Sequence, residues 1–584
     1  MANERPGGAH RVNPDLVPTR AVVRFGPAHH TLALWIVGVL AASVLVLTAD
    51  YQIYDNNFYS LAETPGLLAG DHPYRDFFDW GVPLQAALSA TMQWLVGYRL
   101  IGEFVLQWTW MVAGLVMAFQ IGLRLSRSLV ASFICMLPAI LNFAGTPTVH
   151  NSKLFIYPAA ILIIWRYMEQ PTARRAAAMG AFAAVAFFFR HDHGVYVGAG
   201  VLFGMMLARL ARPEARRPRT IVRDVAACAL ATSVLIAPWA IVVARSEGLI
   251  DYVDARAFIN DTWRVGRPVF LSVLDMNPRL LFAPADPTAP GLSGWVPARG
   301  AAEDWLYQSS VLVVLVILVI ALVDLARAVH QQKPVGIETC RLLLAGVVVA
   351  LVEYRLFRES GYFVLVAPLI AAFGARLLVS STLVPVTRSV TLVLLVISTI
   401  AVGGFVRDSK VLQAGYLLER LPRTFARLLA SPPIDGLASA RDALRIDRAG
   451  WLELGYGDRS TLMIRYMYEC AAPGDRILVS GHTPYQISYY VERPLAGGHL
   501  YWRDLWRSDA RRELQSLDLL RRQSVPFAFS THEPVLDYLS AYPHIRAYMQ
   551  GHYVEIEGSS GHLLVDRRRA PVRAFGALEF PCFR

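Results

Sequence analysis

The stretch Pro83-Leu-Gln-Ala-Ala-Leu-Ser-Ala-Thr-Met-Gln-Trp-Leu-Val-Gly97 decides how the remainder of the chain is arranged. It is apolar, yet it is short and contains the polar residues Gln85, Thr91 and Gln93. A helix that crosses a bilayer needs about 20 mostly apolar residues. We therefore predict that residues 83–97 form a helix that lies along the membrane surface instead of crossing it.

The positive charges beside the longer apolar runs support this choice. With 83–97 on the surface, nearly every short arginine-rich loop falls on the cytoplasmic side, where such loops usually lie. If 83–97 crossed the bilayer, all of those loops would move outside. The prediction is therefore about eleven spans, at residues 31–49, 104–123, 128–145, 154–168, 176–189, 194–208, 225–244, 305–325, 342–354, 361–378 and 389–406.

The composition agrees with a membrane protein. The 584-residue chain is 55% hydrophobic and only 17% charged, and a soluble protein of this length would carry more charge. The net charge of +11 comes mostly from arginines at the ends of apolar runs and not from one basic surface. We therefore predict no nucleic-acid partner.

Three regions follow from these patterns. Residues 1–30 are a basic cytoplasmic leader without a cleavable signal, residues 31–406 are a transmembrane domain with external loops 50–103 and 245–304, and residues 407–584 are an external tail. The tail is rich in charge, tyrosine and turn residues. Its expected strands are 476–480, 525–529, 553–557 and 562–566, with helices at 504–522 and 533–541. The predicted fold class is an α-helical polytopic membrane protein with a C-terminal extracytoplasmic α/β domain.

Two of the five cysteines, Cys470 and Cys582, fall in this polar tail. If the tail is external they can form a disulfide, and otherwise they remain free thiols. The other three lie in or beside apolar runs, where cysteine is usually a packing residue. No cysteine spacing is typical of a zinc site.

The first candidate site follows the first span, in Tyr51-Gln-Ile-Tyr-Asp-Asn-Asn-Phe-Tyr59. Asp55 is a carboxylate among aromatic residues at a membrane surface, where a raised pKa would let it take a proton from an attacking hydroxyl. Tyr59 is a candidate to contact the substrate. The alternative is an ordinary interfacial acid within a belt of tyrosines.

A second candidate segment runs from Gly70 to Leu84 and contains Tyr74, Arg75 and Asp76. Aromatic rings suit the faces of sugars, and acids suit sugar hydroxyls. The alternative is a loop that merely returns the chain to the membrane.

The third candidate is the external turn Arg190-His191-Asp192-His193 between two short spans. Four polar side chains at such a turn are costly unless they are paired or hydrated. They would bind a phosphate or a divalent metal, although His-Asp-His alone fixes no coordination geometry. The alternative is a turn in which Asp192 simply pairs with Arg190.

The fourth candidate is the pair Arg355 and Arg358, flanked by Glu353 and Glu359 in another external turn. The guanidinium fork of arginine suits phosphate oxygens. Positive charge on the outer side also runs against the usual topology. The alternative is Arg–Glu pairing at the membrane surface.

The serial order of these features resembles the GT-C superfamily of membrane glycosyltransferases, particularly the protein O-mannosyltransferase and aminoarabinose-transferase type. The order is one span, Asp55-x-x-x-Tyr59, then Tyr-Arg-Asp-Phe and Gly-x-Pro-Leu, and Arg99 opening the next span. The family's essential acid lies in the first external loop, often within a pair of acids. Here the second position is Asn56, so Asp55 is the sole matching acid.

The resemblance implies a hexosyl- or pentosyltransferase in a bacterial inner membrane. Its donor would be a polyprenyl-phosphate sugar, and its acceptor a hydroxyl of a glycan, lipid or protein on the outer face, with inversion at the anomeric carbon. Asp55 would be the general base, and Arg355, Arg358 and Arg190 would hold the carrier phosphate. Membrane lipids would surround the protein, and the need for a divalent metal stays open.

Other functions remain as alternatives. A transporter or flippase of a lipid-linked saccharide would need ionisable groups near the membrane midplane, whereas the charges here lie mainly at span ends. A polysaccharide polymerase or ligase would use a lipid-diphosphate donor instead. Asn56 also keeps open a non-catalytic cell-envelope assembly subunit.

Overall fold

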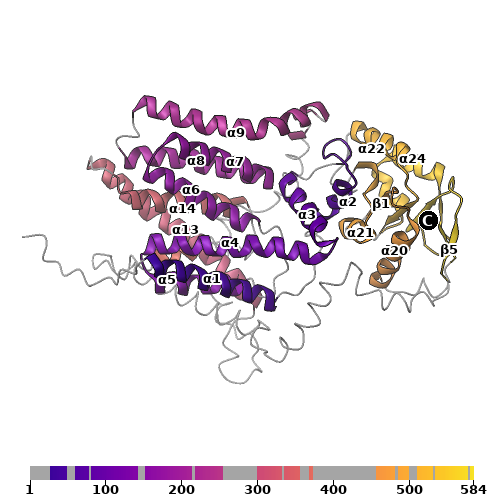
Figure 1. Ribbon diagram of the computed structural model, residues 1–584, viewed down its shortest axis with the longest axis horizontal. Coiled ribbons are helices and arrows are strands. Elements are labelled where there is room, and N and C mark those ends of the chain that lie inside the picture. Colours follow the sequence, from indigo (N-terminus) through magenta and orange to yellow (C-terminus); the bar gives the residue numbers. More distant parts are fainter. Residues whose placement is uncertain are drawn as a thin grey trace, which may run out of the picture.

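The computed structural model describes residues 27–48, 59–77, 81–142, 152–212, 217–246, 248–250, 252–253, 299–331, 335–355, 367–372, 456–480, 484–498, 510–530, 533–576 and 579–584. Figure 1 shows two parts, a bundle of roughly parallel long helices and an α/β unit beyond one of its ends. The short helices α2 (Tyr59–Leu68) and α3 (Pro83–Val96) lie between them.

The bundle contains most of the helices that the apolar runs predict. Those described are α1 (Pro27–Thr48), α4 (Leu100–Ser126), α5 (Leu129–Asn142), α6 (Ser152–Glu169), α7 (Ala173–Phe189), α8 (His191–Ala211), α9 (Pro218–Ser246), α13 (Arg299–His330) and α14 (Ile337–Arg355). Among the described helices, α1, α4, α8 and α9 are long and apolar enough to cross a membrane. The first nine predicted spans are therefore confirmed as helices. The last two fall mostly outside the described residues.

One end of the bundle is closed by an ion-pair network. Arg341 at the start of α14 pairs with Glu169 at the end of α6 and, at 2.9 Å, with Glu338. Arg124 and Arg127 at the end of α4 join the same network through Glu169 and Glu338. Charged residues at helix ends thus serve as links between helices as well as topological signals.

Helix α3 is confirmed in position and lies at the opposite end of the bundle, beside the α/β unit (Figure 1). Pro83 occupies its first turn, and it ends at Gly97, whose φ of 73° is a left-handed C-cap. Its buried face carries polar side chains between small apolar ones: the buried residues are Gln85, Ala86, Ser89, Ala90 and Gln93.

The opposite face of α3 is apolar and exposed. Trp94 and Leu95 are 71% and 62% exposed. A helix in water would bury these side chains and expose its glutamines. This reversed distribution supports the predicted position of α3 at a lipid surface.

The tail folds as an α/β unit around a small sheet. Its strands are β1 (Ile477–Ser480), β2 (Phe527–Ser530), β3 (Tyr553–Glu555) and β4 (Leu563–Asp566), in the order β1-β2-β4-β3. β1 and β2 are parallel, with Ile477 opposite Phe527, while β4 runs antiparallel to β2 and β3. All four predicted strands are confirmed. β1, β2 and β4 are buried on both faces, as strands covered by helices usually are.

Several elements of the unit were not expected from the sequence. Of the expected helices, 504–522 is described as α22 (Ala510–Arg522), and 533–541 as α23 (Val535–Tyr538) with η10 (Leu539–Ala541). The additional elements are α20 (Tyr456–Cys470), α21 (Pro484–Val491), η8 (Ala496–Gly498), α24 (Pro543–His552) and the hairpin of β5 (Arg573–Phe575) with β6 (Phe580–Cys582).

The core of the α/β unit continues into helices α2 and α4. One face of the sheet packs in a single apolar cluster with Leu61 and Ala62 of α2, Phe77, and Phe104 of α4. The other face packs against α22 and α24 in a separate cluster. The unit therefore shares its core with α2 and α4.

Cys470 at the end of α20 is bonded to Cys582 in β6, at a sequence separation of 112. The alternative of two free thiols is thereby removed. Cys135 and Cys340 are buried thiols, and Cys228 is half-buried.

We predict that replacing Cys582 by Ser lowers the free energy of unfolding of the α/β unit by about 2–5 kcal/mol, because a cross-link over a long loop restricts the unfolded chain. Thermal unfolding of the purified protein in detergent measures the loss. A reducing agent should lower the stability of the native protein to that of the variant and leave the variant unchanged. A native protein indifferent to the reducing agent would contradict the prediction.

Candidate functional site

The turn between α7 and α8 is a single residue, Arg190. Its extended backbone, with φ −165° and ψ 132°, ends α7 and caps α8. His191, Asp192 and His193 therefore form the first turn of α8, at the end of the bundle that faces α3 and the α/β unit. The sequence predicted a turn here, and in the structure the turn is one residue long.

Arg190 and Asp192 form a two-point ion pair. The Nε of Arg190 donates to Oδ1 of Asp192 at 2.6 Å, and a terminal nitrogen donates to Oδ2 at 2.8 Å. This is the pairing predicted as the alternative to a binding role. Both groups are only partly buried, so the guanidinium stays accessible at the end of the bundle.

The two histidines of the turn point into different surroundings. His193 is buried, with Nδ1 2.8 Å from the hydroxyl of Tyr157 and 3.6 Å from Oδ1 of Asp192. His191 places Nδ1 2.9 Å from the carbonyl oxygen of Phe187 and Nε2 2.5 Å from the hydroxyl of Tyr252. Since a carbonyl only accepts, Nδ1 of His191 donates, and a neutral ring accepts from Tyr252 at Nε2.

Tyr74 joins this site from the loop between α2 and α3, which the sequence predicts to be external. Its hydroxyl accepts a hydrogen bond from Nε1 of Trp239 in α9 at 2.7 Å. Its ring packs edge-on against Trp239 and Tyr252, with centroids 6.4 and 5.5 Å apart. Phe187 stacks on His191 at 4.1 Å. We call Tyr74, Phe187, His191, Trp239 and Tyr252 the aromatic cluster.

Gly81 sets the distance between the first loop and α8. Its carbonyl accepts from the backbone N–H of His191 at 3.2 Å. Its φ is +80°, and an added Cβ would lie 3.0 Å from Cδ2 of His191. Both the conformation and the contact require glycine here.

Arg75 and Asp76 lie beside Tyr74 but form their own unit. The Nε of Arg75 donates to Asp76 at 2.9 Å, and the backbone N–H of His72 donates to the same carboxylate at 2.9 Å. The hydrogen bonds from Arg75 hold the pKa of Asp76 below its usual value. Arg75 is itself 63% exposed, so it is accessible to a ligand from outside.

The structure brings only part of the predicted site together. Tyr74 and His191 share the aromatic cluster, and Arg190 and Asp192 adjoin it. His193 faces Tyr157 instead. Asp55 and Arg358 lie outside the described residues, and for Tyr59 and Arg355 only the backbone is described, as the first residue of α2 and the last of α14.

The packing of α14 against α8 locates Arg355 along the bundle. Gly200 lies against Val348 and Gly204 approaches Leu344, so the two helices run antiparallel. Continuing this pairing to the end of α14 brings Arg355 level with the first turn of α8. The backbone of Arg355 is thus at the same end of the bundle as Arg190.

Sequence reasoning missed Tyr157, Phe187 and Trp239. All three lie inside apolar runs, where an aromatic residue is normally a packing residue. Tyr252 follows α9 and belongs to the loop predicted for 245–304. Within the described ranges there is no group of three or more His, Cys, Asp or Glu residues arranged to hold a metal ion.

Comparison with solved structures finds similar chains. The chain is similar to the crystal structure of ArnT from Cupriavidus metallidurans bound to undecaprenyl phosphate, with 12% sequence identity, a TM-score of 0.44, and coverage of 93% of this chain and 98% of that one. No protein-family model matches the sequence, and no curated protein matches it.

We predict that Gly81→Ala lowers the free energy of unfolding by about 1–3 kcal/mol, because alanine is strained at positive φ and would press on His191. Thermal unfolding in detergent measures the effect. Gly198→Ala in α8 is the matched control, since an added Cβ there meets nothing within 4 Å. Equal stability of the two variants would contradict the role given to Gly81.

Proposed function

We propose that the protein is a GT-C-type glycosyltransferase that moves a hexose or pentose from a polyprenyl-phosphate carrier to an acceptor hydroxyl on the outer face of the membrane. One observation carries the proposal. Tyr74 from the first external loop and His191 from the α7–α8 turn, both predicted as substrate residues, meet in one aromatic cluster beside Arg190.

The aromatic cluster suits a sugar at a membrane surface. Its rings offer apolar faces, while the hydroxyls of Tyr74 and Tyr252 and the ring of His191 supply polar contacts. Sites that bind small molecules commonly combine mostly apolar walls with a few placed polar groups. The exposed apolar face of α3 lies at the same end of the bundle, where a lipid tail would run.

Arginines suit the carrier phosphate. The guanidinium of Arg190 already holds a carboxylate through two hydrogen bonds, and this geometry also fits a phosphate. Arg190 precedes the first turn of α8, whose backbone dipole favours an anion. Arg355 ends α14 level with that turn, and Arg358 follows it in sequence. Together they would stabilise the charge that develops on the departing phosphate.

Asp55 is assigned as the general base through the family resemblance. It precedes Tyr59, the first residue of α2, and α2 packs into the core that joins the bundle to the α/β unit. In the proposed step its carboxylate accepts the proton of the acceptor hydroxyl. The hydroxyl oxygen bonds to the anomeric carbon while the bond from that carbon to the phosphate oxygen breaks. A single displacement of this kind inverts the anomeric centre.

The Cys470–Cys582 disulfide supports an external position for the α/β unit. Disulfides persist in oxidising compartments such as the bacterial periplasm. Because the unit shares its core with α2 and α4, the aromatic cluster would then open on the same side. An inner-membrane protein with a periplasmic catalytic face has this arrangement.

We predict that Asp55→Asn lowers kcat for sugar transfer by at least about a hundredfold, the usual contribution of a general base. The assay uses purified protein in vesicles with a panel of synthetic polyprenyl-phosphate pentoses and hexoses, and it measures released polyprenyl phosphate. Asp537→Asn, at an exposed position of the α/β unit, is the control and should keep full activity.

Two results would overturn the proposal. Full activity of Asp55→Asn would remove the assigned base. Movement of intact donor across the vesicle bilayer, without release of polyprenyl phosphate, would favour the transporter or flippase instead.

A further inference from the structure

We infer that the α/β unit holds the loop of residues 71–77 at both ends and thereby positions Tyr74 in the aromatic cluster. Arg476 and Gly498 are the positioning residues. The kinetic consequence rests on the proposed function, whereas the structural coupling does not. The unit would thus act as part of the enzyme and not as an appended domain.

The first anchor is an ion pair between Arg476 and Asp71. Both terminal nitrogens of Arg476 donate to the Asp71 carboxylate, one at 2.8 Å to Oδ2 and the other to Oδ1. The two side chains are 17% and 10% exposed. Two parallel hydrogen bonds in a mostly buried pair fix orientation as well as distance.

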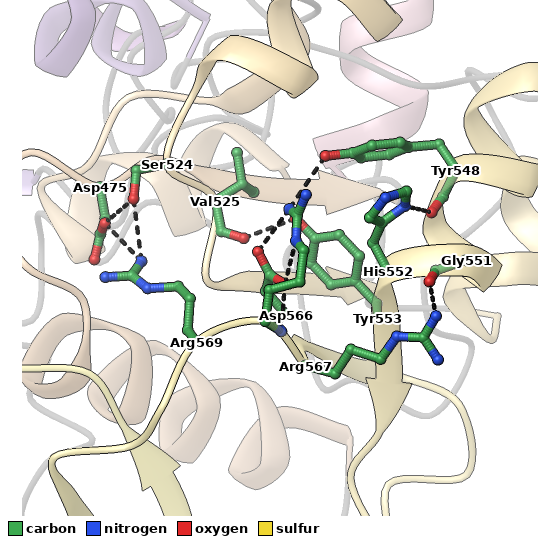
Figure 2. Close-up of polar contacts among 11 residues, drawn as sticks. Asp475, Ser524, Val525, Tyr548, Gly551, His552, Tyr553, Asp566, Arg567 and Arg569 are labelled. Carbon is green, nitrogen blue, oxygen red and sulfur yellow. Dashed lines mark hydrogen bonds and ion pairs between the residues drawn. The ribbon is translucent and has the colours of Figure 1, made fainter.

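The backbone around Arg476 is held in place by contacts within the α/β unit. Asp475, the preceding residue, accepts from Oγ of Ser524 at 2.6 Å and from Arg569 at 2.8 Å (Figure 2). Arg476 also donates its backbone N–H to the carbonyl of Ser524 at 2.8 Å. The two adjacent residues therefore point in opposite directions, with Asp475 tied into the α/β unit and Arg476 reaching the loop.

The second anchor is the close approach of Gly498 to Asp76. At Gly498, with φ +71°, an added Cβ would lie 3.1 Å from the carbonyl oxygen of Asp76 and 2.7 Å from a methyl carbon of Leu519. The backbone of the α/β unit therefore lies directly against the far end of the loop. Only glycine suits both this conformation and this contact.

Between the anchors the loop is a closed turn. The Asp76 carboxylate accepts from the backbone N–H of His72, and the N–H of Tyr74 donates to the carbonyl of Phe77 at 3.1 Å. Tyr74 has a φ of 74°, which is uncommon for a residue with a side chain. Such a conformation persists where the surroundings hold it, and here they are the anchors on one side and Trp239 on the other.

The loop therefore links the α/β unit to the site. Asp71 and Asp76 are held by the unit, and Tyr74 between them bonds Trp239 and contacts Tyr252, which bonds His191. Loss of the Arg476 pair would leave Tyr74 without its fixed support. The consequence is a displaced ring in the cluster while both folded parts remain intact.

The test compares Arg476→Gln, Asp71→Asn and the double variant in the full-length protein. The matched control is Arg568→Gln, because Arg568 forms the same kind of two-point pair with Asp566 in the same unit, at 2.8 and 2.7 Å, and does not touch the loop. Arg476→Lys keeps the charge without the fork and serves where Gln impairs folding. The first readout is the fluorescence emission of Trp239, obtained by subtracting the spectrum of the same protein with Trp239→Phe. The second readout is kcat and KM for sugar transfer.

Arg476→Gln and Asp71→Asn should each shift the Trp239 emission to longer wavelength and lower kcat by about tenfold to a hundredfold, as a misplaced binding group does. The double variant should match the single variants, because the two residues act as one pair. Arg568→Gln should change neither quantity. Unchanged Trp239 emission in folded Arg476→Gln or Arg476→Lys would overturn the inference. If the native protein transfers no sugar from any donor, the proposed function is wrong. The Trp239 emission then still shows whether Arg476 and Asp71 position Tyr74.

Discussion

The contact between α3 and the α/β unit is the constraint on which the rest of the structure depends. Helix α3 exposes Trp94 and buries Gln93, and a buried amide needs a polar partner. The α/β unit supplies one, since the hydroxyl of Tyr489 in α21 donates to the side-chain oxygen of Gln93 at 2.8 Å. This contact joins α3 to the α/β unit across a sequence separation of 396.

The same interface explains why the bundle, the two short helices and the α/β unit form one body. Tyr98, just after α3, stacks on Tyr489 with ring centroids 4.9 Å apart. Apolar residues of α2 and α4 complete the core on one face of the sheet. Polar contacts give this interface its orientation, while burial of apolar area gives it most of its stability.

The candidate site lies beside this interface, at the end of the bundle opposite the Glu169–Arg341 network. Its residues come from α7, α8, α9, the loop that contains Tyr74, and Tyr252 beyond the end of α9, and each is held by a neighbour. Arg190 is held by Asp192, His191 by Phe187 and Tyr252, and Tyr74 by Trp239. Preorganised groups of this kind favour binding because little order is lost when a ligand arrives.

The sequence by itself determined the positions of the helices, including the short helix at 83–97, and of the four strands of the tail. A helix in contact with lipid needs a run of apolar residues, and its ends in water carry charged residues. Both patterns lie within one short stretch of sequence, so they can be recognised without the tertiary structure. It also identified the Arg190–His193 turn, because four polar residues between apolar runs demand an explanation. Only the tertiary structure decided that Tyr74 meets Trp239 and Tyr252, and that Arg476 reaches Asp71. These contacts join segments with no common local pattern, so they are fixed by packing and not by composition.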